Sequence, residues 1–200
     1  MIYFEIAIAV LLVVAFIHFQ LTKRKNRYQT ALLYNQLASN EEMKKTLAMG
    51  LYLRFRKENL DQNLKLSPSY LRQNPDSFED FVADIYQKAK GGSTWVTPSS
   101  GDFGVDFEHR TEKGLFLGQV KCYSEDLDFT PIALIHSNMV KSGAEGGYVI
   151  TTSSFTPSAR KYAERLNNID LIDGVKLVEL WIEGLEDTEQ EINTLIPEIN

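Results

Sequence analysis

The 200-residue chain contains very little cysteine and histidine. Its single cysteine, Cys122, excludes an internal disulfide framework and any zinc module built from several cysteines. The three histidines, His18, His109 and His136, lie far apart in the sequence, which argues against a histidine-based metal cluster. Basic residues are absent before the first apolar run, although a cleaved signal peptide normally carries them there.

Positive charge is also unevenly distributed. Residues 1–20 contain no Lys or Arg, residues 21–66 contain ten against four acids, and residues 67–200 contain eleven against twenty-two. The overall net charge of −6 argues against a protein that coats nucleic acid by charge alone. These breaks suggest three physically different segments. Together with the patterns described below, they predict a transmembrane helix over residues 1–20, a basic helical arm and linker over 21–75, a folded domain over 76–182 and an acidic, solvated tail over 183–200.

The first segment has the composition of a membrane anchor. Residues 6–17 form an uninterrupted apolar run, and the helix around it is about 28 Å long at ~1.5 Å per residue, close to the thickness of the bilayer core. Four basic residues follow within ten positions, so the positive-inside rule predicts a single-pass membrane protein with a cytoplasmic C-terminal domain. A buried core helix and a cleaved signal are the alternatives. The basic residues are Lys23, Arg24, Lys25 and Arg27.

The second segment is rich in helix-forming residues and contains no proline between residues 28 and 60. Its last basic residues are Arg54, Arg56 and Lys57. Contact of these bases with anionic lipid headgroups is the favoured interpretation. An arm that contacts nucleic-acid phosphates is the alternative.

The third segment begins with a helix and a hairpin. Ser77 with Asp80 resembles a capping box, and apolar residues from Phe78 onward recur at helical spacing as far as Lys90. Residues 103–109 and 115–122 alternate as strands on either side of a polar turn. If Arg110 pairs with Leu115, Asp106 falls opposite Gln119, with Lys121 one step further along the same face and Gly104 leaving open space beside it.

This register brings a carboxylate, an amide and an ammonium group together. A hard divalent cation prefers oxygen ligands, which Asp106, the Gln119 amide and the Val120 carbonyl can supply. Lys121 can then stabilise negative charge that develops on a phosphorus centre. A surface hairpin that merely carries one acid, one amide and one base explains the same pattern, and the spacing alone does not separate the two interpretations.

A resemblance to a known family separates them. Phe78-Glu79, Gly101-Asp-Phe-Gly-Val-Asp106, Gln119-Val-Lys121, the run Val149–Ala159 and the run Ile169–Gly174 resemble the Mrr-type restriction endonucleases. This is the branch of the PD-(D/E)xK nucleases in which glutamine replaces the acid before x-Lys. The five blocks occur in the family's order over residues 77–182.

The resemblance implies an α/β fold with a mixed central sheet flanked by helices. It implies that Asp106 and Gln119 form the metal end of the site with the Val120 carbonyl, that Lys121 is the catalytic lysine, and that Glu79 reaches them from its helix. DNA, often modified, is the implied substrate, and Mg²⁺ is the implied cofactor with Mn²⁺ as an alternative. A homodimer is one of the assemblies left open.

The remaining elements fit this fold. A helix is predicted from Thr130, strands at 147–151 and 169–172, a helix from Thr156 to about Asn167, and a last helix over 175–181. Four hydroxyl side chains are candidate contacts for DNA phosphates, although those at the helix start are equally explained as an ordinary cap. They are Ser100, Thr152, Ser153 and Thr156.

The predicted function is therefore a membrane-anchored, metal-dependent DNA endonuclease of the restriction type. One rival is a non-catalytic nucleic-acid-binding or scaffold protein that keeps the fold, and the acidic charge of residues 67–200 favours it. A structure-selective resolvase or repair nuclease is the other.

Overall fold

A computed structural model describes residues 2–56, 77–98 and 104–195, with only the backbone described for residues 2, 5, 7, 9, 27 and 186–195. Contacts divide the chain into two compact units, Met1–Asn40 and Glu41–Asn200. The first unit is one continuous helix, α1 (Ile2–Ser39). Among the described residues, no helix meets the length and apolarity that a membrane span requires.

The second unit begins with α2 (Glu41–Phe55) and continues, after the undescribed residues, with α4 (Phe78–Lys90). A five-stranded sheet and three more helices follow. They are β1 (Ser93–Val96), β2 (Phe107–Thr111), β3 (Gly114–Lys121), α5 (Thr130–Ser142), β4 (Gly146–Thr151), α6 (Pro157–Ala163), β5 (Ile169–Ile172) and α7 (Gly174–Leu195).

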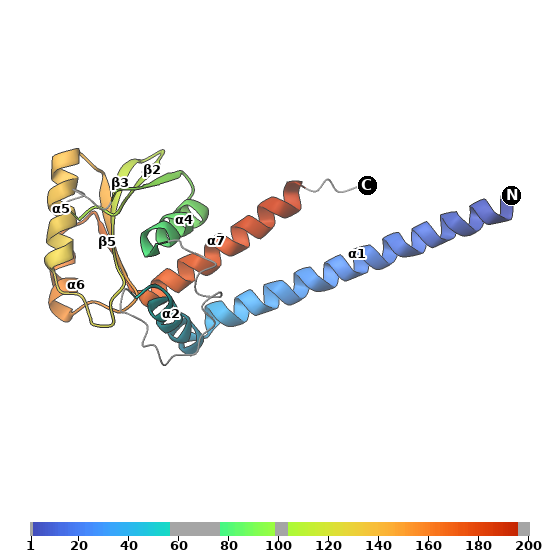
Figure 1. The fold of residues 1–200 in the computed structure, drawn as a ribbon, viewed down its shortest axis with the longest axis horizontal. Coiled ribbons are helices and arrows are strands. Elements are labelled where there is room, and N and C mark those ends of the chain that lie inside the picture. The colour runs from blue at the N-terminus through green and yellow to red at the C-terminus, as the bar shows by residue number, and fades with distance from the viewer. Residues whose placement is uncertain (1, 57–76, 99–103, 196–200) are drawn as a thin grey trace. The chain divides into compact units, whose positions relative to one another are not determined.

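The sheet is mixed, as the resemblance implied. The strand order is β1-β2-β3-β4-β5, with antiparallel pairs from β1 to β3 and parallel pairs from β3 to β5. Figure 1 shows α5 and α6 on one face of the sheet and α4 and α7 on the other. The parallel strands are joined through α5 and α6, because a parallel pair needs a crossover connection. The α/β fold class is thereby confirmed.

Two apolar layers hold the sheet between its helices. Aliphatic side chains such as Val149, Ile132 and Ile135 fill the face under α5 and α6, and all three are fully buried. Aromatic rings fill much of the face under α4 and α7, where Tyr86 lies 4.5 Å from Tyr148 between ring centroids. Because apolar side chains cover both faces of the sheet, their burial fixes which way each strand residue points.

The predicted helix and hairpin are confirmed. Ser77 is the N-cap of α4, and its side chain and that of Asp80 form a capping box. Arg110 pairs with Leu115 as predicted, and Thr111 also pairs with Gly114, so the turn is two residues shorter than expected. The register that the candidate site depends on is therefore the observed one.

The structure differs from the predicted segment boundaries at two places. The helix α2 packs against α7, so it belongs with the sheet rather than with a separate arm over 21–75. The helix α7 continues to Leu195, well beyond the predicted end at residue 181 and into the predicted acidic tail. Glu183, the first residue of the predicted tail, forms an ion pair with Lys90 of α4 at 3.0 Å, which gives this acid a partner inside the fold.

Candidate active site

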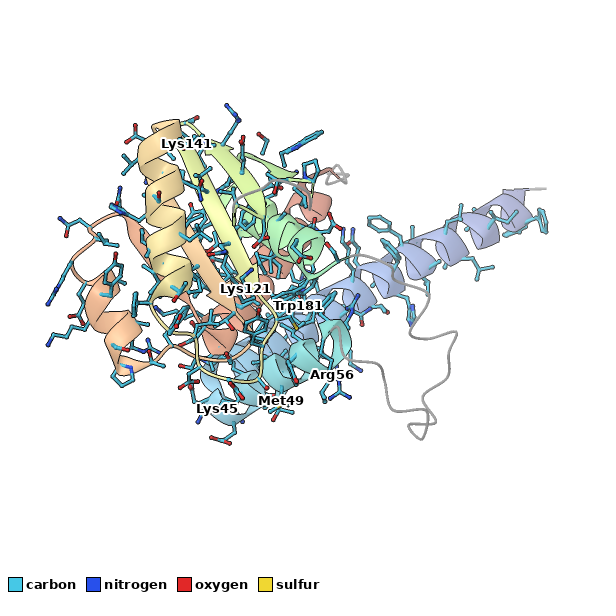
Figure 2. All side chains as sticks on the ribbon, turned by 60° about the vertical axis from the view of Figure 1, so that its left-hand side comes forward. Lys45, Met49, Arg56, Lys121, Lys141 and Trp181 are labelled. Atoms are coloured by element: carbon cyan, nitrogen blue, oxygen red, sulfur yellow. The ribbon has the colours of Figure 1, made fainter. Side chains whose placement is uncertain are left out.

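A pocket of about 720 Å³ opens where β3 ends. Its walls come from four parts of the chain: the last turn of α2, the first turn of α4, the end of β3 and the loop that follows β3. Figure 2 labels Lys121 and Arg56, which come from two of these walls. The lining residues include Tyr52, Arg54, Phe55, Arg56, Ser77, Phe78, Glu79, Val120, Lys121, Cys122, Tyr123, Ser124 and Glu125.

Asp106 lies where the chain enters β2 and is held by hydrogen bonds of its backbone and of its carboxylate. Its backbone N–H donates to the Gly118 carbonyl at 2.8 Å, and its own carbonyl accepts from the Thr97 N–H at 2.9 Å. Its carboxylate oxygen Oδ2 accepts from the Val120 N–H at 2.6 Å. The carboxylate is thus fixed against β3, at the residue that lies between Gln119 and Lys121.

Gln119 is almost completely buried, with 3% of its surface exposed. Its Oε1 atom is shielded from solvent and has no hydrogen-bond partner among the described residues. A buried polar atom without a partner costs about 1–3 kcal/mol, so such atoms are rare in folds unless a ligand meets them. Gln119 therefore offers an acceptor to a donor or a cation at this point.

The open space expected beside Gly104 is absent. A Cβ atom at Gly104 would lie 2.8 Å from Gln119 Nε2 and 2.3 Å from Leu134 Cδ2. This residue also has a φ of +85°, a conformation that other residues rarely adopt. The glycine is needed for close packing against the Gln119 amide, and the pocket lies instead on the side of Glu79 and Lys121.

Glu79 and Lys121 come together from distant parts of the sequence. Glu79 is in the first turn of α4, Lys121 is the last residue of β3, and both half-buried side chains line the pocket. Asp106 and Gln119 do not line it but lie next to it through Val120, whose neighbours in β3 are Gln119 and Lys121. Of the predicted residues, the structure thus gathers these five at one end of the hairpin.

Of the four hydroxyl side chains predicted to contact phosphates, the three that the structure describes are not among the lining residues of the pocket. Thr152 and Ser153 donate their hydroxyl hydrogens to the carbonyls of Tyr123 and Glu125, at 2.9 Å and 2.6 Å. Thr156 caps α6 by accepting from the Ala159 N–H at 3.2 Å, which matches the alternative of an ordinary cap. Ser100 lies outside the described residues.

No group of three or more His, Cys, Asp or Glu side chains that could hold a metal ion occurs among the described residues. The site instead combines two acids, Glu79 and Asp106, with an amide oxygen from Gln119. Oxygen ligands of this mixed kind are those that hard divalent cations accept.

The wall contributed by α2 was missed by reasoning from the sequence. Arg54 and Arg56 line the pocket, whereas the favoured interpretation assigned them to lipid headgroups. Both arginines lie at the end of a helix of mixed composition. Nothing local in the sequence tells which surface that helix end meets.

Comparison with known proteins gives the site a family context. Residues 71–181 match the family model described as Mrr_cat, restriction endonuclease. The type IV methyl-directed restriction enzyme EcoKMrr of Escherichia coli strain K12 is 28% identical over 143 residues, which cover 64% of this chain and 47% of that enzyme. The chain thus spans about half the length of this curated relative.

Two solved structures are also similar. The DNA modification-dependent restriction endonuclease AspBHI aligns with a TM-score of 0.49 and 16% identity, over 74% of this chain and 38% of that one. The MspJI restriction endonuclease in complex with a 27-mer oligonucleotide aligns with a TM-score of 0.41 and 18% identity, over 84% and 34%. The family model alone covers more than half of the chain, and the chain belongs to the Mrr-type restriction endonuclease family of PD-(D/E)xK nucleases.

Proposed function

We propose that this chain is a divalent-metal-dependent endonuclease that hydrolyses phosphodiester bonds in DNA for restriction. One observation carries the proposal: the register of β2 and β3 fixes the Asp106 carboxylate on the Val120 N–H, between Gln119 and Lys121, inside the region that matches the family. The name of the Escherichia coli relative, a methyl-directed enzyme, supports DNA that carries modified bases as the substrate.

A divalent cation fits the oxygen atoms of this site. The buried Gln119 Oε1 lacks a partner among the described residues, and a cation would satisfy it. The Asp106 carboxylate, the Val120 carbonyl and the Glu79 carboxylate would complete the protein ligands to Mg²⁺ or Mn²⁺. When bound, the cation supplies Lewis acidity to the phosphodiester.

The chain's own residues have separate tasks in hydrolysis. A water oxygen bonds to phosphorus, the bond from phosphorus to one sugar oxygen breaks, and that oxygen leaves with a proton. The Lys121 ammonium group stabilises the negative charge that grows on the phosphoryl oxygens, and its partial burial strengthens this interaction relative to bulk water. Glu79, in the same pocket, orients the attacking water by accepting its hydrogen bond.

We also propose that the chain is anchored in the bacterial inner membrane by its N-terminal residues, with the nuclease in the cytoplasm. The apolar run over residues 6–17 and the basic residues that follow it support this placement. Within α1, Leu11, Val13 and Phe16 are between 46% and 68% exposed, so water would meet a large apolar surface that lipid would cover.

Protease added to intact spheroplasts tests the orientation. The second unit should stay uncut until the membrane is disrupted, and the protein should stay in the membrane during an alkaline carbonate wash. Digestion from outside would contradict the cytoplasmic placement, and release by the wash would contradict the anchor.

Plasmid cleavage tests the nuclease. The full chain in detergent should nick or linearise plasmid DNA when Mg²⁺ or Mn²⁺ is present and should be inactive in EDTA. Methylated plasmid should be cut faster than the same plasmid from a strain without methyltransferases. Binding of DNA without cleavage under any of these metals would replace the nuclease by the non-catalytic scaffold.

A further inference from the structure

The last turn of α2 brings basic side chains into the pocket from outside the matched family region. Arg56 lines the pocket together with Lys121 and Glu79, which belong to the family's residues 71–181. The Arg56 side chain is half-buried. Its Nε atom is shielded from solvent and has no hydrogen-bond partner in the part of the chain that the structure describes.

An unsatisfied donor on a charged group is costly to keep. Leaving a buried donor without an acceptor costs about 1–3 kcal/mol, and more when the group is charged. Arg54, two residues earlier, differs because its guanidinium lies 4.7 Å from the centroid of the Phe55 ring. Of the two arginines in this wall, Arg56 is therefore the one whose guanidinium group we expect to bind an anion from outside the chain.

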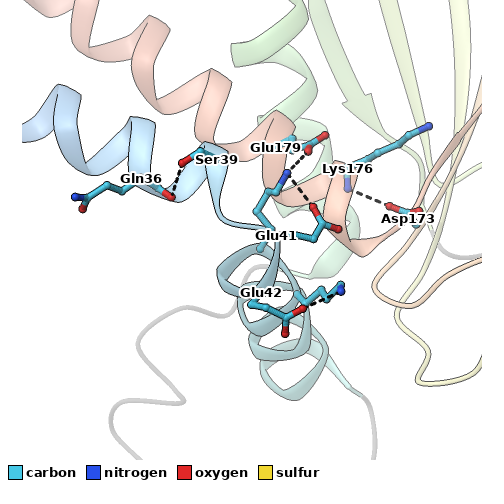
Figure 3. Close-up of polar contacts among 9 residues, drawn as sticks. Gln36, Ser39, Glu41, Glu42, Asp173, Lys176 and Glu179 are labelled. Carbon is cyan, nitrogen blue, oxygen red and sulfur yellow. Dashed lines mark hydrogen bonds and ion pairs between the residues drawn. The ribbon is translucent and has the colours of Figure 1, made fainter.

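The helix α2, which ends at the residue before Arg56, is fixed to the domain at both ends. Near its start, Lys44 is 7% exposed and lies 2.5 Å from Glu179 and 3.3 Å from Glu41. Figure 3 labels Glu41 and Glu179 and marks these two ion pairs with dashed lines. At its end, the Phe55 ring packs between two rings of α4, and the Arg56 N–H donates to the Tyr52 carbonyl at 2.9 Å. These contacts hold the Arg56 backbone in place before any ligand arrives.

Charge gives a reason for this arrangement. Residues 67–200 carry twice as many acids as bases, which opposes the approach of a polyanion, whereas residues 21–66 are net basic. The α2 wall adds two guanidinium groups to the ammonium of Lys121 in a pocket whose lining acids are Glu79 and Glu125. A guanidinium group also matches the oxygens of a phosphate better than an ammonium group does.

We propose that Arg56 binds a backbone phosphate of the DNA that enters this pocket, so that α2 is part of the DNA-binding site. The inference rests on the proposed nuclease function, because it takes the same pocket as the place of the phosphodiester. It assigns α2 to the substrate rather than to lipid.

The test compares three variants of the full chain in detergent. Arg56→Ala removes the contact, and Arg56→Lys keeps the charge but not the planar group. Lys45→Ala is the matched control, because it removes one charge from an exposed side chain of α2 that pairs with Glu42 at 3.0 Å and lies outside the pocket lining. The readouts are the Kd for a short fluorescein-labelled duplex in Ca²⁺, its dependence on salt, plasmid cleavage in Mg²⁺, and the melting temperature without DNA.

Arg56→Ala should bind the duplex about 10-fold more weakly, the scale for one charge-assisted hydrogen bond. The slope of log K against log salt should fall by about 0.9, the value for one lost phosphate contact. Arg56→Lys should recover part of the affinity, and Lys45→Ala should bind like the parent. The melting temperature of Arg56→Ala should not fall, because the variant removes a donor that has no partner without DNA.

Each other result contradicts a stated claim. If Arg56→Ala binds with the parent's Kd and salt slope while the parent cleaves plasmid, the inference fails and the nuclease function stands. Equal losses for Arg56→Ala and Lys45→Ala would also overturn it, because they would reflect general charge rather than a contact. Binding that depends on Arg56 without any cleavage supports the inference and removes the nuclease function. A parent that neither binds nor cleaves DNA overturns both.

Discussion

The hairpin of β2 and β3 contributes to two buried polar clusters that differ in how completely the chain satisfies them. In the aromatic cluster, formed by His109, Tyr86 and Tyr148, His109 is fully buried and lies 2.7 Å from the Gly91 carbonyl through Nε2. Because a carbonyl only accepts, Nε2 carries the hydrogen and Nδ1 accepts from the Tyr148 hydroxyl at 3.4 Å. Both ring nitrogens of His109 therefore have partners inside the fold.

The candidate site shows the opposite arrangement a few residues away. Gln119 Oε1 is buried without a hydrogen-bond partner among the described residues. Arg56 Nε, in the pocket wall that follows α2, is also buried without such a partner. A polar cluster in which every buried atom has a hydrogen-bond partner stabilises the fold. A cluster with buried atoms that lack partners is less stable without a ligand and is suited to bind one. The contrast teaches which buried polar residues to assign to structure and which to function, and it predicts that their variants fail in different ways.

The largest effect is expected at Asp106. The variant Asp106→Asn keeps an oxygen for the Val120 N–H but removes the charge that a cation requires. The rate of cleavage should fall about 10³-fold or more, because the activation barrier rises by several kcal/mol, and the melting temperature should change little. Plasmid cleavage and thermal unfolding of the same preparation check this. A loss of folding equal to that of a core variant would place Asp106 with the structural cluster instead.

Lys121→Ala is expected to have the next largest effect. The ammonium group stabilises the transition state rather than holding the cation, so cleavage should slow by about 10²-fold while metal affinity stays near that of the parent. Calorimetric titration with Mn²⁺ beside the cleavage assay separates the two roles. Equal losses of metal binding and cleavage would make Lys121 a structural part of the metal site.

His109→Ala should do the reverse. Removing this buried side chain leaves a cavity, and the Gly91 carbonyl and the Tyr148 hydroxyl lose their hydrogen-bond partner. The free energy of unfolding should fall by about 3 kcal/mol as a result. The folded fraction should cleave DNA at the parent's rate. His136→Ala, on the partly buried face of α5, is the matched control for loss of a histidine. Unfolding curves in urea at a permissive temperature measure the difference.

The smallest effect is a pH dependence of the aromatic cluster. Burial raises the pKa of Tyr148 from 10.0 to about 12 and raises the pKa of Tyr86 well above 10.0. The unfolded chain therefore loses these protons first, so the stabilisation is complete below pH 10 and is lost as the pH rises through 12. The loss should be roughly 1–2 kcal/mol for Tyr148, with partial solvent access taken into account. Melting temperatures between pH 9 and 12 should fall less steeply for Tyr148→Phe than for the parent.

The sequence predicts what depends on local pattern. The capping box at Ser77 and the apolar spacing of α4 are contained in a few neighbouring residues, and the pairing of Arg110 with Leu115 follows from alternation around one turn. These features led to the end of the hairpin where Asp106, Gln119 and Lys121 lie in the observed register. The resemblance to the family added Glu79, which the spacing alone did not connect to the hairpin.

The sequence does not predict what depends on distant contacts. The ion pair that buries Lys44 joins residues 135 positions apart, so the packing of α2 could not be read from its basic composition. Glu183 of α7 likewise pairs with Lys90, 93 positions away, so its place in the fold could not be read from the acidic composition of the tail. The side chain of Gln119 packs beside Gly104 because Leu134 of α5 closes that side, a contact that no strand pattern encodes.

The most direct test of the central claim is plasmid cleavage by the parent chain, Asp106→Asn and His109→Ala in detergent, with Mg²⁺ and with EDTA. The account predicts cleavage by the parent in Mg²⁺ alone, none by folded Asp106→Asn, and parental cleavage by the folded fraction of His109→Ala. Cleavage by Asp106→Asn at the parent's rate would contradict it and would leave the hairpin without a catalytic role.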